Sequence, residues 1–212
     1  ASTEVNRGSI NVTLTVTLSN PSSVNGTVKY QSADGTAKAG LDYTALPSTT
    51  LTYTPGQTSK TFTVAVLGDT LPEFGEAFYV NLSSATNATI ARAKATVTIN
   101  DNDPDPTLAI NDVVQKEGDS SSSSAVFSVN LAYASGKPVS VKYKTTDGTA
   151  TSSGKDYGAK TGTLTFAPGV TAQTVAIAVT GDKVSEPDED FFLDLYDAVN
   201  VNPSGNDLQG KC

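Results

Sequence analysis

The sequence contains no histidine, methionine or tryptophan, and its single cysteine is Cys212. Zinc and copper sites usually need histidine or several thiolates, so both are disfavoured. Without histidine, the commonest general base for activating a nucleophile is also missing. One cysteine cannot form a disulfide within the chain. These absences predict a protein that is not an enzyme and holds no transition metal.

Basic residues and long apolar runs are scarce as well. Lys and Arg number 14 against 22 Asp and Glu, which gives a formal net charge of −8 and a sequence pI of about 4.4. Nucleic acids and anionic membranes attract clustered Lys and Arg, and no apolar run approaches the length of a membrane span. The sequence therefore predicts no nucleic-acid partner and no membrane insertion, and cations are the natural partners.

The chain repeats itself at an offset of about 113 residues. The matching segments are Asp34-Gly-Thr-Ala with Asp147-Gly-Thr-Ala, Gly40-x-Asp-Tyr with Gly154-x-Asp-Tyr, and the pattern Gly-Asp-x-x-x-Glu-x-x-Glu-x-Phe at 68–78 and 181–191. This repeat predicts two modules, at residues 1–103 and 107–212. Two closely spaced prolines predict a stiff linker at 104–106.

Runs of alternating apolar and polar residues, typical of half-buried strands, lie between the matching segments. They cover 10–18, 28–30, 51–53, 62–66, 78–82 and 95–99 in the first module, and 108–110, 125–131, 139–143, 164–166, 175–179 and 191–195 in the second. The pattern predicts an all-β protein of two tandem immunoglobulin-like antiparallel β-sandwiches. A serine-rich stretch at 120–124 predicts a loop.

The two modules differ at their ends. The second uses 107–116 for a first strand that has no counterpart in the first module, and the first uses 94–99 for a last strand that the second is expected to lack. Unpaired edges invite another strand. Two explanations stay open: a window from a longer array, or a self-assembling subunit whose neighbour supplies the strand. Neighbouring repeats or identical subunits are therefore expected partners.

Acidic residues fall in connections that an up-and-down sandwich brings to one pole. The candidates in the first module are Glu4, Asp42, Asp69, Glu73, Asp101 and Asp103. Converging carboxylates repel one another unless they are protonated or bridged by metal, and Ca²⁺ accepts six to eight oxygen ligands from loops. A calcium site is therefore predicted, although each acid taken alone is an ordinary turn residue. Asp34 and Asp147 are assigned to turns, and Glu76 to a role in the fold.

The combined motifs resemble Calx-beta domains. The resemblance is carried by Asp34-Gly-Thr-Ala, Gly40-x-Asp42-Tyr43, Pro55-Gly56, Asp69 with Glu73-x-x-Glu76-x-Phe78, and Thr98-Ile-Asn-Asp101-Asn-Asp103. It implies calcium binding through the acids of the first module and, in the second, through Glu117, Asp156, Asp182 and Glu186. Gly68, Gly181 and Asn102 stand where calcium-binding members often carry further acids, and the second module lacks the acidic tail. The resemblance therefore implies fewer ions and an incomplete second site.

Two functions fit this sequence. The first is a non-enzymatic, extracellular calcium-binding structural or adhesive module, either a segment of a larger surface protein or a filament subunit with strand exchange, and its partner would be another surface protein or a glycan. The alternative is a calcium-sensing regulatory pair coupled to a transporter or signalling protein. The scarcity of cysteine and lysine favours the first function and a cell-surface location.

Overall fold

The computed structural model describes residues 2–3, 5 and 7–212. In that part of the chain there are strands, turns and loops but no helix, and therefore no helix able to cross a membrane. The chain divides into two compact units, Ala1–Asp103 (unit 1) and Pro104–Cys212 (unit 2). The predicted all-β fold is confirmed.

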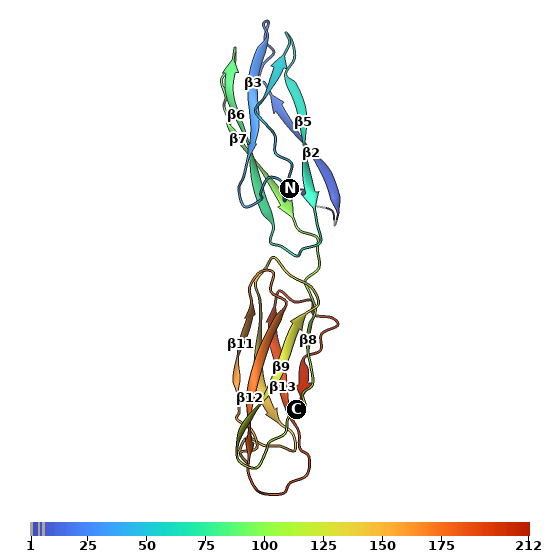
Figure 1. Ribbon diagram of the computed structural model, residues 1–212. Helices are drawn as coiled ribbons and strands as arrows, with labels where there is room; N and C mark the ends of the chain where they lie inside the picture. The colour runs from blue at the N-terminus through green and yellow to red at the C-terminus, as the bar shows by residue number, and fades with distance from the viewer. Residues whose placement is uncertain (1, 4, 6) are drawn as a thin grey trace. The chain divides into compact units, whose positions relative to one another are not determined.

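Unit 1 is a sandwich of two sheets. One sheet has the strand order β1-β7-β6-β3-β4, and β2 and β5 form the other. Figure 1 shows β3, β6 and β7 on one side of the unit and β2 and β5 on the other. The strands are β1 (Ser2–Thr3), β2 (Gly8–Thr17), β3 (Gly26–Ala33), β4 (Thr49–Tyr53), β5 (Ser59–Gly68), β6 (Glu76–Thr86) and β7 (Lys94–Asn100).

Alternate residues of facing strands form the core of unit 1. Val64 and Val66 of β5 are buried, and so are Phe78 and Val80 of β6. Because side chains alternate between the two faces of a strand, this spacing turns one face of each strand inward. Tyr43, from the β3–β4 connection, completes the core and is only 1% exposed.

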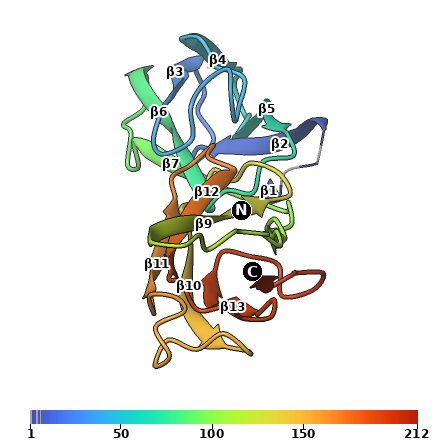
Figure 2. The same cartoon turned by 60° about the horizontal axis from the view of Figure 1, so that its bottom comes forward.

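Unit 2 has the same two-layer plan. Its sheets have the orders β11-β10-β13-β14 and β12-β9-β8, and Figure 2 shows β9 and β12 together in one layer. The strands are β8 (Leu108–Ile110), β9 (Ser121–Leu131), β10 (Val139–Asp147), β11 (Thr161–Phe166), β12 (Ala172–Gly181), β13 (Phe191–Val199) and β14 (Gln209–Lys211). The serine-rich stretch predicted as a loop belongs largely to β9, where Ser121 pairs with Gly181.

The prediction that unit 2 lacks its last strand is wrong. Residues 209–211 form β14, which pairs with β13 through Leu193 opposite Gly210. Cys212 continues the pairing by exchanging backbone hydrogen bonds with Phe191 at 3.0 and 3.2 Å. Sequence alternation missed this strand because its inward position is Gly210, where an added Cβ would lie 2.9 Å from the Phe127 ring. The partner strand, rather than apolar alternation, defines β14.

The first strand of unit 1 is reduced rather than absent. β1 has two residues and pairs in parallel with β7, where Ser2 lies opposite Ile99. In unit 2 the first strand, β8, pairs instead with β9. Within the described residues, β2 pairs with β5 and has no strand on its other side. In the part of the chain that the structure describes, the first strand of unit 1 therefore does not take the place beside β2 that β8 takes beside β9.

Candidate metal centre

Asp42 is placed at one pole of unit 1 by the connection between β3 and β4. Asp34 organises this connection, because its Oδ1 accepts hydrogen bonds from the Tyr43 hydroxyl at 2.8 Å and the Ala39 amide at 3.0 Å. Both bonds lower the pKa of Asp34 below its usual value, and the bond from Tyr43 has the larger effect. Asp42 itself accepts a hydrogen bond from the Lys38 amide at 2.5 Å. The buried Tyr43 therefore fixes Asp42 at the edge of the core.

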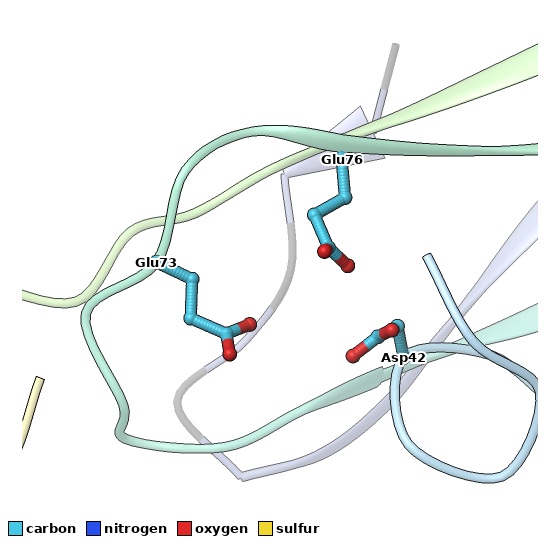
Figure 3. Close-up of side chains that lie close together, drawn as sticks. All are labelled: Asp42, Glu73 and Glu76. Carbon is cyan, nitrogen blue, oxygen red and sulfur yellow. The ribbon is translucent and has the colours of Figure 1, made fainter. Parts of the chain in front are cut away.

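Glu73 and Glu76 reach the same pole from the connection between β5 and β6. Glu76 is the first residue of β6 and pairs with Ile99 of β7. The carboxylates of Asp42, Glu73 and Glu76 converge, and one oxygen of each lies within 4.8 Å of the other two. Figure 3 shows the three carboxylates turned toward a common space. All three residues are partly buried, and we call them the unit 1 triad.

The triad holds excess negative charge. Burial, followed by the hydrogen bond with Asp42 and the charges of Asp42 and Glu73, raises the pKa of Glu76 to about 7. The pKa of Glu73 is also raised, first by burial and then by the charges of Asp69, Asp42, Asp101 and Asp103. Carboxyl groups keep their protons in this way when neighbouring charges and lost hydration disfavour the ionised form. A bound cation would offset the repulsion between these carboxylates.

Other predicted acids surround the triad. The carboxylate of Asp101 accepts hydrogen bonds from the Glu73 amide at 2.8 Å and from the Asp103 amide at 3.0 Å. Asp69 accepts one from the Leu71 amide at 2.7 Å. Asp101 thus holds the backbone that carries Glu73, while Asp69 and Asp103 act on the triad through their charge. Grouping at one pole is what the sequence predicts for these residues.

Two acidic residues of unit 1, Glu4 and Glu76, differ from the candidates above. Glu4, the remaining candidate of unit 1, lies outside the described residues. The sequence pattern predicts a role in the fold for Glu76, yet Glu76 is a member of the triad. A signal was available, because Glu76 precedes Phe78 by two positions and therefore shares its face of β6. Since Phe78 is fully buried, that face of β6 points inward. Glu76 is the first residue of this face and lies at the pole.

Unit 2 repeats the triad with Asp156, Glu186 and Glu189, again with oxygens within 4.8 Å of one another. Asp156 is partly buried and accepts a hydrogen bond from the Thr151 amide at 2.7 Å, whereas Glu186 and Glu189 are exposed. The pKa of Glu186 is raised, first by reduced hydration and then by nearby negative charges. These charges belong to Asp182, Glu189, Glu117 and Asp156. The predicted ligands Glu117 and Asp182 are therefore near this cluster. Its exposure distinguishes it from the unit 1 triad.

Gly68 and Gly181 are explained by close backbone contacts. A Cβ added to Gly68 would lie 1.5 Å from the Val5 carbonyl oxygen, and one added to Gly181 would lie 2.4 Å from the Gly118 carbonyl oxygen. Real Cβ atoms do not approach backbone oxygens so closely, so an aspartate at either position requires the neighbouring segment to move. The crossing of the chain thus excludes one acid from each pole.

The donor set of the triad fits Ca²⁺. One oxygen of each triad residue lies within 4.8 Å of the other two, close enough for one ion, because two oxygens bound to Ca²⁺ at about 2.4 Å lie at most about 4.8 Å apart. All donors are carboxylates, the ligands that hard divalent cations prefer, and they belong to loops and a strand end that tolerate irregular coordination. The nitrogen and sulfur donors of structural zinc sites are not part of this cluster.

Fold and site together define a tandem of immunoglobulin-like sandwiches, each with a carboxylate cluster at one pole. The family model of the Calx-beta domain matches residues 1–103 and again residues 111–208. The chain belongs to the Calx-beta family. The carboxylate clusters have the composition to hold a hard divalent cation such as Ca²⁺.

Several known proteins are similar to this chain. Sodium/calcium exchanger 3 of Rattus norvegicus is 30% identical over 189 residues, which cover 79% of this chain and 20% of the exchanger. Sodium/calcium exchanger 1 of Canis lupus familiaris is 29% identical over 186 residues, with 79% and 19% covered. A crystal structure of the calcium-binding domain CBD12 of CALX1.1 is 24% identical, with 92% of this chain and 75% of that chain covered and a TM-score of 0.43.

These relatives correct one expectation from the sequence. The predicted extracellular, cell-surface location is wrong, because the two relatives named above, which match over 79% of this chain, are sodium/calcium exchangers and not adhesion proteins. The chain spans about a fifth of the length of these exchangers. Scarce cysteine and lysine were the basis of that prediction, and neither is specific to a compartment.

Proposed function

We propose that this chain is a calcium-sensing regulatory pair that acts on a transporter of the sodium/calcium exchanger type. The observation that carries the proposal is the unit 1 triad, whose oxygens lie within 4.8 Å of one another and whose Glu76 has its pKa raised to about 7. Similarity to sodium/calcium exchangers over 79% of the chain supports regulation of transport over the structural or adhesive role. The pair is proposed to be non-catalytic.

Asp42, Glu73 and Glu76 are the proposed direct ligands in unit 1. A bound Ca²⁺ would supply the positive charge that this cluster lacks. Asp101 orients the site, because its carboxylate is engaged by the amides of Glu73 and Asp103. Asp69 and Asp103 add negative charge that strengthens attraction of a cation to the pole.

The connection at residues 69–75 is the proposed responding element. It contains no strand, and two of its amides donate to carboxylates, Leu71 to Asp69 and Glu73 to Asp101. Carboxylates that repel one another favour a loosened connection, and neutralising them favours the compact one. Because carboxylates hold two of its amides, the connection is suited to respond to a change in their charge.

The two units are proposed to differ in affinity. Glu186 and Glu189 of unit 2 are exposed, whereas the unit 1 triad is partly buried. Water screens charge–charge interactions at exposed sites more effectively, so an ion at the unit 2 cluster is held less tightly. The pair would then respond to calcium over a wider concentration range than one unit alone.

The test is calcium titration by calorimetry on the intact chain and on a variant that combines Asp42→Asn with Glu73→Gln. Both changes remove charge and keep the shape of the side chain. The control is Asp197→Asn, an exposed acid paired with Lys142 on another part of the chain. We expect the double variant to lose the tighter binding event and the control to keep it. An intact chain that binds no Ca²⁺ would refute the proposal.

Sensing is separated from simple stabilisation by hydrogen exchange. A sensor predicts slower exchange at residues 69–75 on addition of Ca²⁺, lost in the double variant. Uniform protection of the whole unit, with no extra effect in this connection, would contradict a sensing role while leaving calcium binding intact.

A further inference from the structure

Unit 1 separates its charges. Apart from Glu4, its acidic residues lie within residues 34–42, 69–76 and 101–103, the segments that form the pole of the triad. Residues 5–33, 43–68 and 77–100 contain no Asp or Glu, but they contain the cations Arg7, Lys29, Lys60, Arg92 and Lys94. These three stretches therefore carry positive charge only, in a chain of net charge −8.

Part of this positive charge lies on the outer face of the larger sheet, where β7, β6 and β3 are neighbours (Figure 1). Tyr30 of β3, Val80 of β6 and Val97 of β7 turn toward the core and are at most 9% exposed. Because successive side chains point to opposite faces of a strand, their neighbours along each strand point outward. We call six of these outward residues the lysine face: Lys29, Gln31, Tyr79, Asn81, Ser83 and Lys94.

The register of the strands sets the spacing of the cations. Lys29 lies opposite Ser83, and Lys94 lies opposite Asn81, so two strand spacings and two residues separate the lysines. With about 4.8 Å between strands and about 3.3 Å per residue, their Cα atoms are about 12 Å apart. Arg92 adds a third cation at the edge of the face, because its Nε donates to the Lys94 carbonyl at 3.0 Å.

The corresponding face of unit 2 has an acidic partner for its lysine. At the repeat offset of about 113 residues, Lys142 corresponds to Lys29 and Asp197 to Ser84. Ser84 and Asp197 share a positive φ, 49° and 51°. Lys142 Nζ lies 3.0 Å from Asp197 Oδ2, whereas Lys29 forms no ion pair with any residue that the structure describes. The charge of Lys29 is therefore open to an outside ligand.

The second lysine of the face is replaced in unit 2. Asn81 lies opposite Lys94, and at the corresponding pair Asp194 lies opposite Gln209. Gln209 Nε2 donates to Asp194 Oδ1 at 2.7 Å. Unit 2 thus has a carboxylate where unit 1 has a neutral amide, and a neutral amide where unit 1 has an ammonium group. Lys94 Nζ lies 3.2 Å from the centre of the Tyr79 ring, which holds the ammonium group on this face.

An anionic membrane is a poor match for the lysine face. Near an anionic surface, each Lys or Arg strengthens binding only about fivefold. Membranes bind proteins in this way through clusters of about four to eight such residues, and this face with Arg92 has three. The six residues of the face include no aliphatic side chain, so insertion into the lipid adds little.

An extended acidic polypeptide matches the face in charge, spacing and hydrogen bonding. In an extended chain, side chains four residues apart lie on the same side and are about 13 Å apart, close to the separation of Lys29 and Lys94. Carboxylates form charge-assisted hydrogen bonds with ammonium and guanidinium groups, and these are stronger than bonds between neutral groups. Asn81 and Ser83 lie between the lysines and offer hydrogen bonds to peptide groups.

We propose that the lysine face binds an extended, acidic segment of a partner polypeptide. Two carboxylates of the segment, four residues apart, bind Lys29 and Lys94, and a neighbouring carboxylate binds Arg92. The amide of Asn81 and the hydroxyl of Ser83 bind the backbone between them. This surface is separate from the triad, so binding does not require calcium.

The probe is the peptide acetyl-Gly-Glu-Thr-Glu-Thr-Glu-Gly with a neutral fluorescent label, added to the full chain without calcium at low salt and followed by fluorescence anisotropy. We expect saturable binding, and none by the same peptide with glutamine in place of glutamate. The double variant Lys29→Gln with Lys94→Gln should weaken binding by about tenfold or more. Lys60→Gln is the control, because Lys60 lies on β5 of the other sheet, and it should leave binding unchanged.

A second double variant, Asn81→Asp with Ser84→Asp, keeps both lysines and gives them acidic neighbours. Unit 2 has aspartates at the corresponding positions, so the fold accepts them, and thermal unfolding followed by circular dichroism checks this. Peptide binding should again weaken by about tenfold or more. Absence of binding by the intact chain at about 1 mM peptide would overturn the proposal, and so would binding that both double variants retain. Binding to phosphatidylserine vesicles without binding to the peptide would overturn it in favour of a membrane.

Discussion

Tyr43 stacks on Phe78, with ring centroids 4.0 Å apart and an angle of 6° between the ring planes. Tyr43 directly follows Asp42 in the sequence, and Phe78 lies two residues after Glu76. One aromatic contact therefore joins the two segments that carry these carboxylates. Unit 2 repeats the arrangement, since Tyr157 stacks on Phe191 at 4.2 Å and 13°. The core contact and the ligand spacing of each pole are coupled.

Phe78→Leu tests this coupling. The change keeps an apolar side chain but removes the stacking, so unit 1 should lose about 1–2 kcal/mol of unfolding free energy. Calcium affinity should fall as well, because Asp42 and Glu76 are no longer held together. Chemical unfolding and calorimetry measure the two effects. Phe191→Leu is the matched variant and should spare the tighter site. Equal effects of both variants on that site would contradict the coupling.

A pH dependence follows from Glu76. Its pKa is about 7 in the folded chain against an ordinary value of 4.5. Below pH 4.5 both states hold the proton, and between 4.5 and 7 the folded state keeps a proton that the unfolded state has lost. The metal-free stability of unit 1 should therefore decrease as pH rises through this window. Urea unfolding from pH 4 to 8 measures it, and Glu76→Gln should flatten the profile.

Glu76→Gln should move stability and calcium affinity in opposite directions. Without calcium at pH 8, the amide removes one of several repelling charges, so the thermal midpoint should rise. With calcium, a charged ligand is lost, and affinity should fall by about tenfold or more. Differential scanning calorimetry with and without Ca²⁺ shows both. A variant that is less stable in both conditions would indicate that Glu76 has a purely structural role.

Much of the fold follows from local alternation. The run at 10–18 predicts β2 (Gly8–Thr17) nearly to its ends, because one face of that strand packs on the core. Alternation of apolar and polar residues does not predict β14 or β1. β14 has Gly210 at its inward position, and β1 has two residues. Both are strands because a neighbouring strand supplies backbone partners, which the sequence of the strand itself does not reveal.

The candidate site, like the fold, is predictable from the sequence only in part. Connectivity alone brings Asp42, Glu73 and Asp101 to one pole, since the connections between antiparallel strands alternate between the two ends of a sandwich. Which carboxylates converge depends on strand direction and on the inward rotation of the first residue of β6, and this made Glu76 easy to miss. Whether Glu186 and Glu189 are buried or exposed depends on the packing around them, which no spacing rule contains.

Gly68 offers a test of why unit 1 has no further acid at its pole. Gly68→Ala brings a Cβ to within 1.5 Å of the Val5 carbonyl oxygen, so the segment at Val5 must be displaced or the variant must unfold more easily. We expect a loss of about 2–3 kcal/mol in urea unfolding. Gly26→Ala is the control in the same unit, because its Cβ would meet the Thr86 carbonyl oxygen at an ordinary 3.5 Å. If Gly68→Ala were no more costly than this control, the backbone crossing would not explain the glycine, and Gly68→Asp could then be used to add a ligand to the pole.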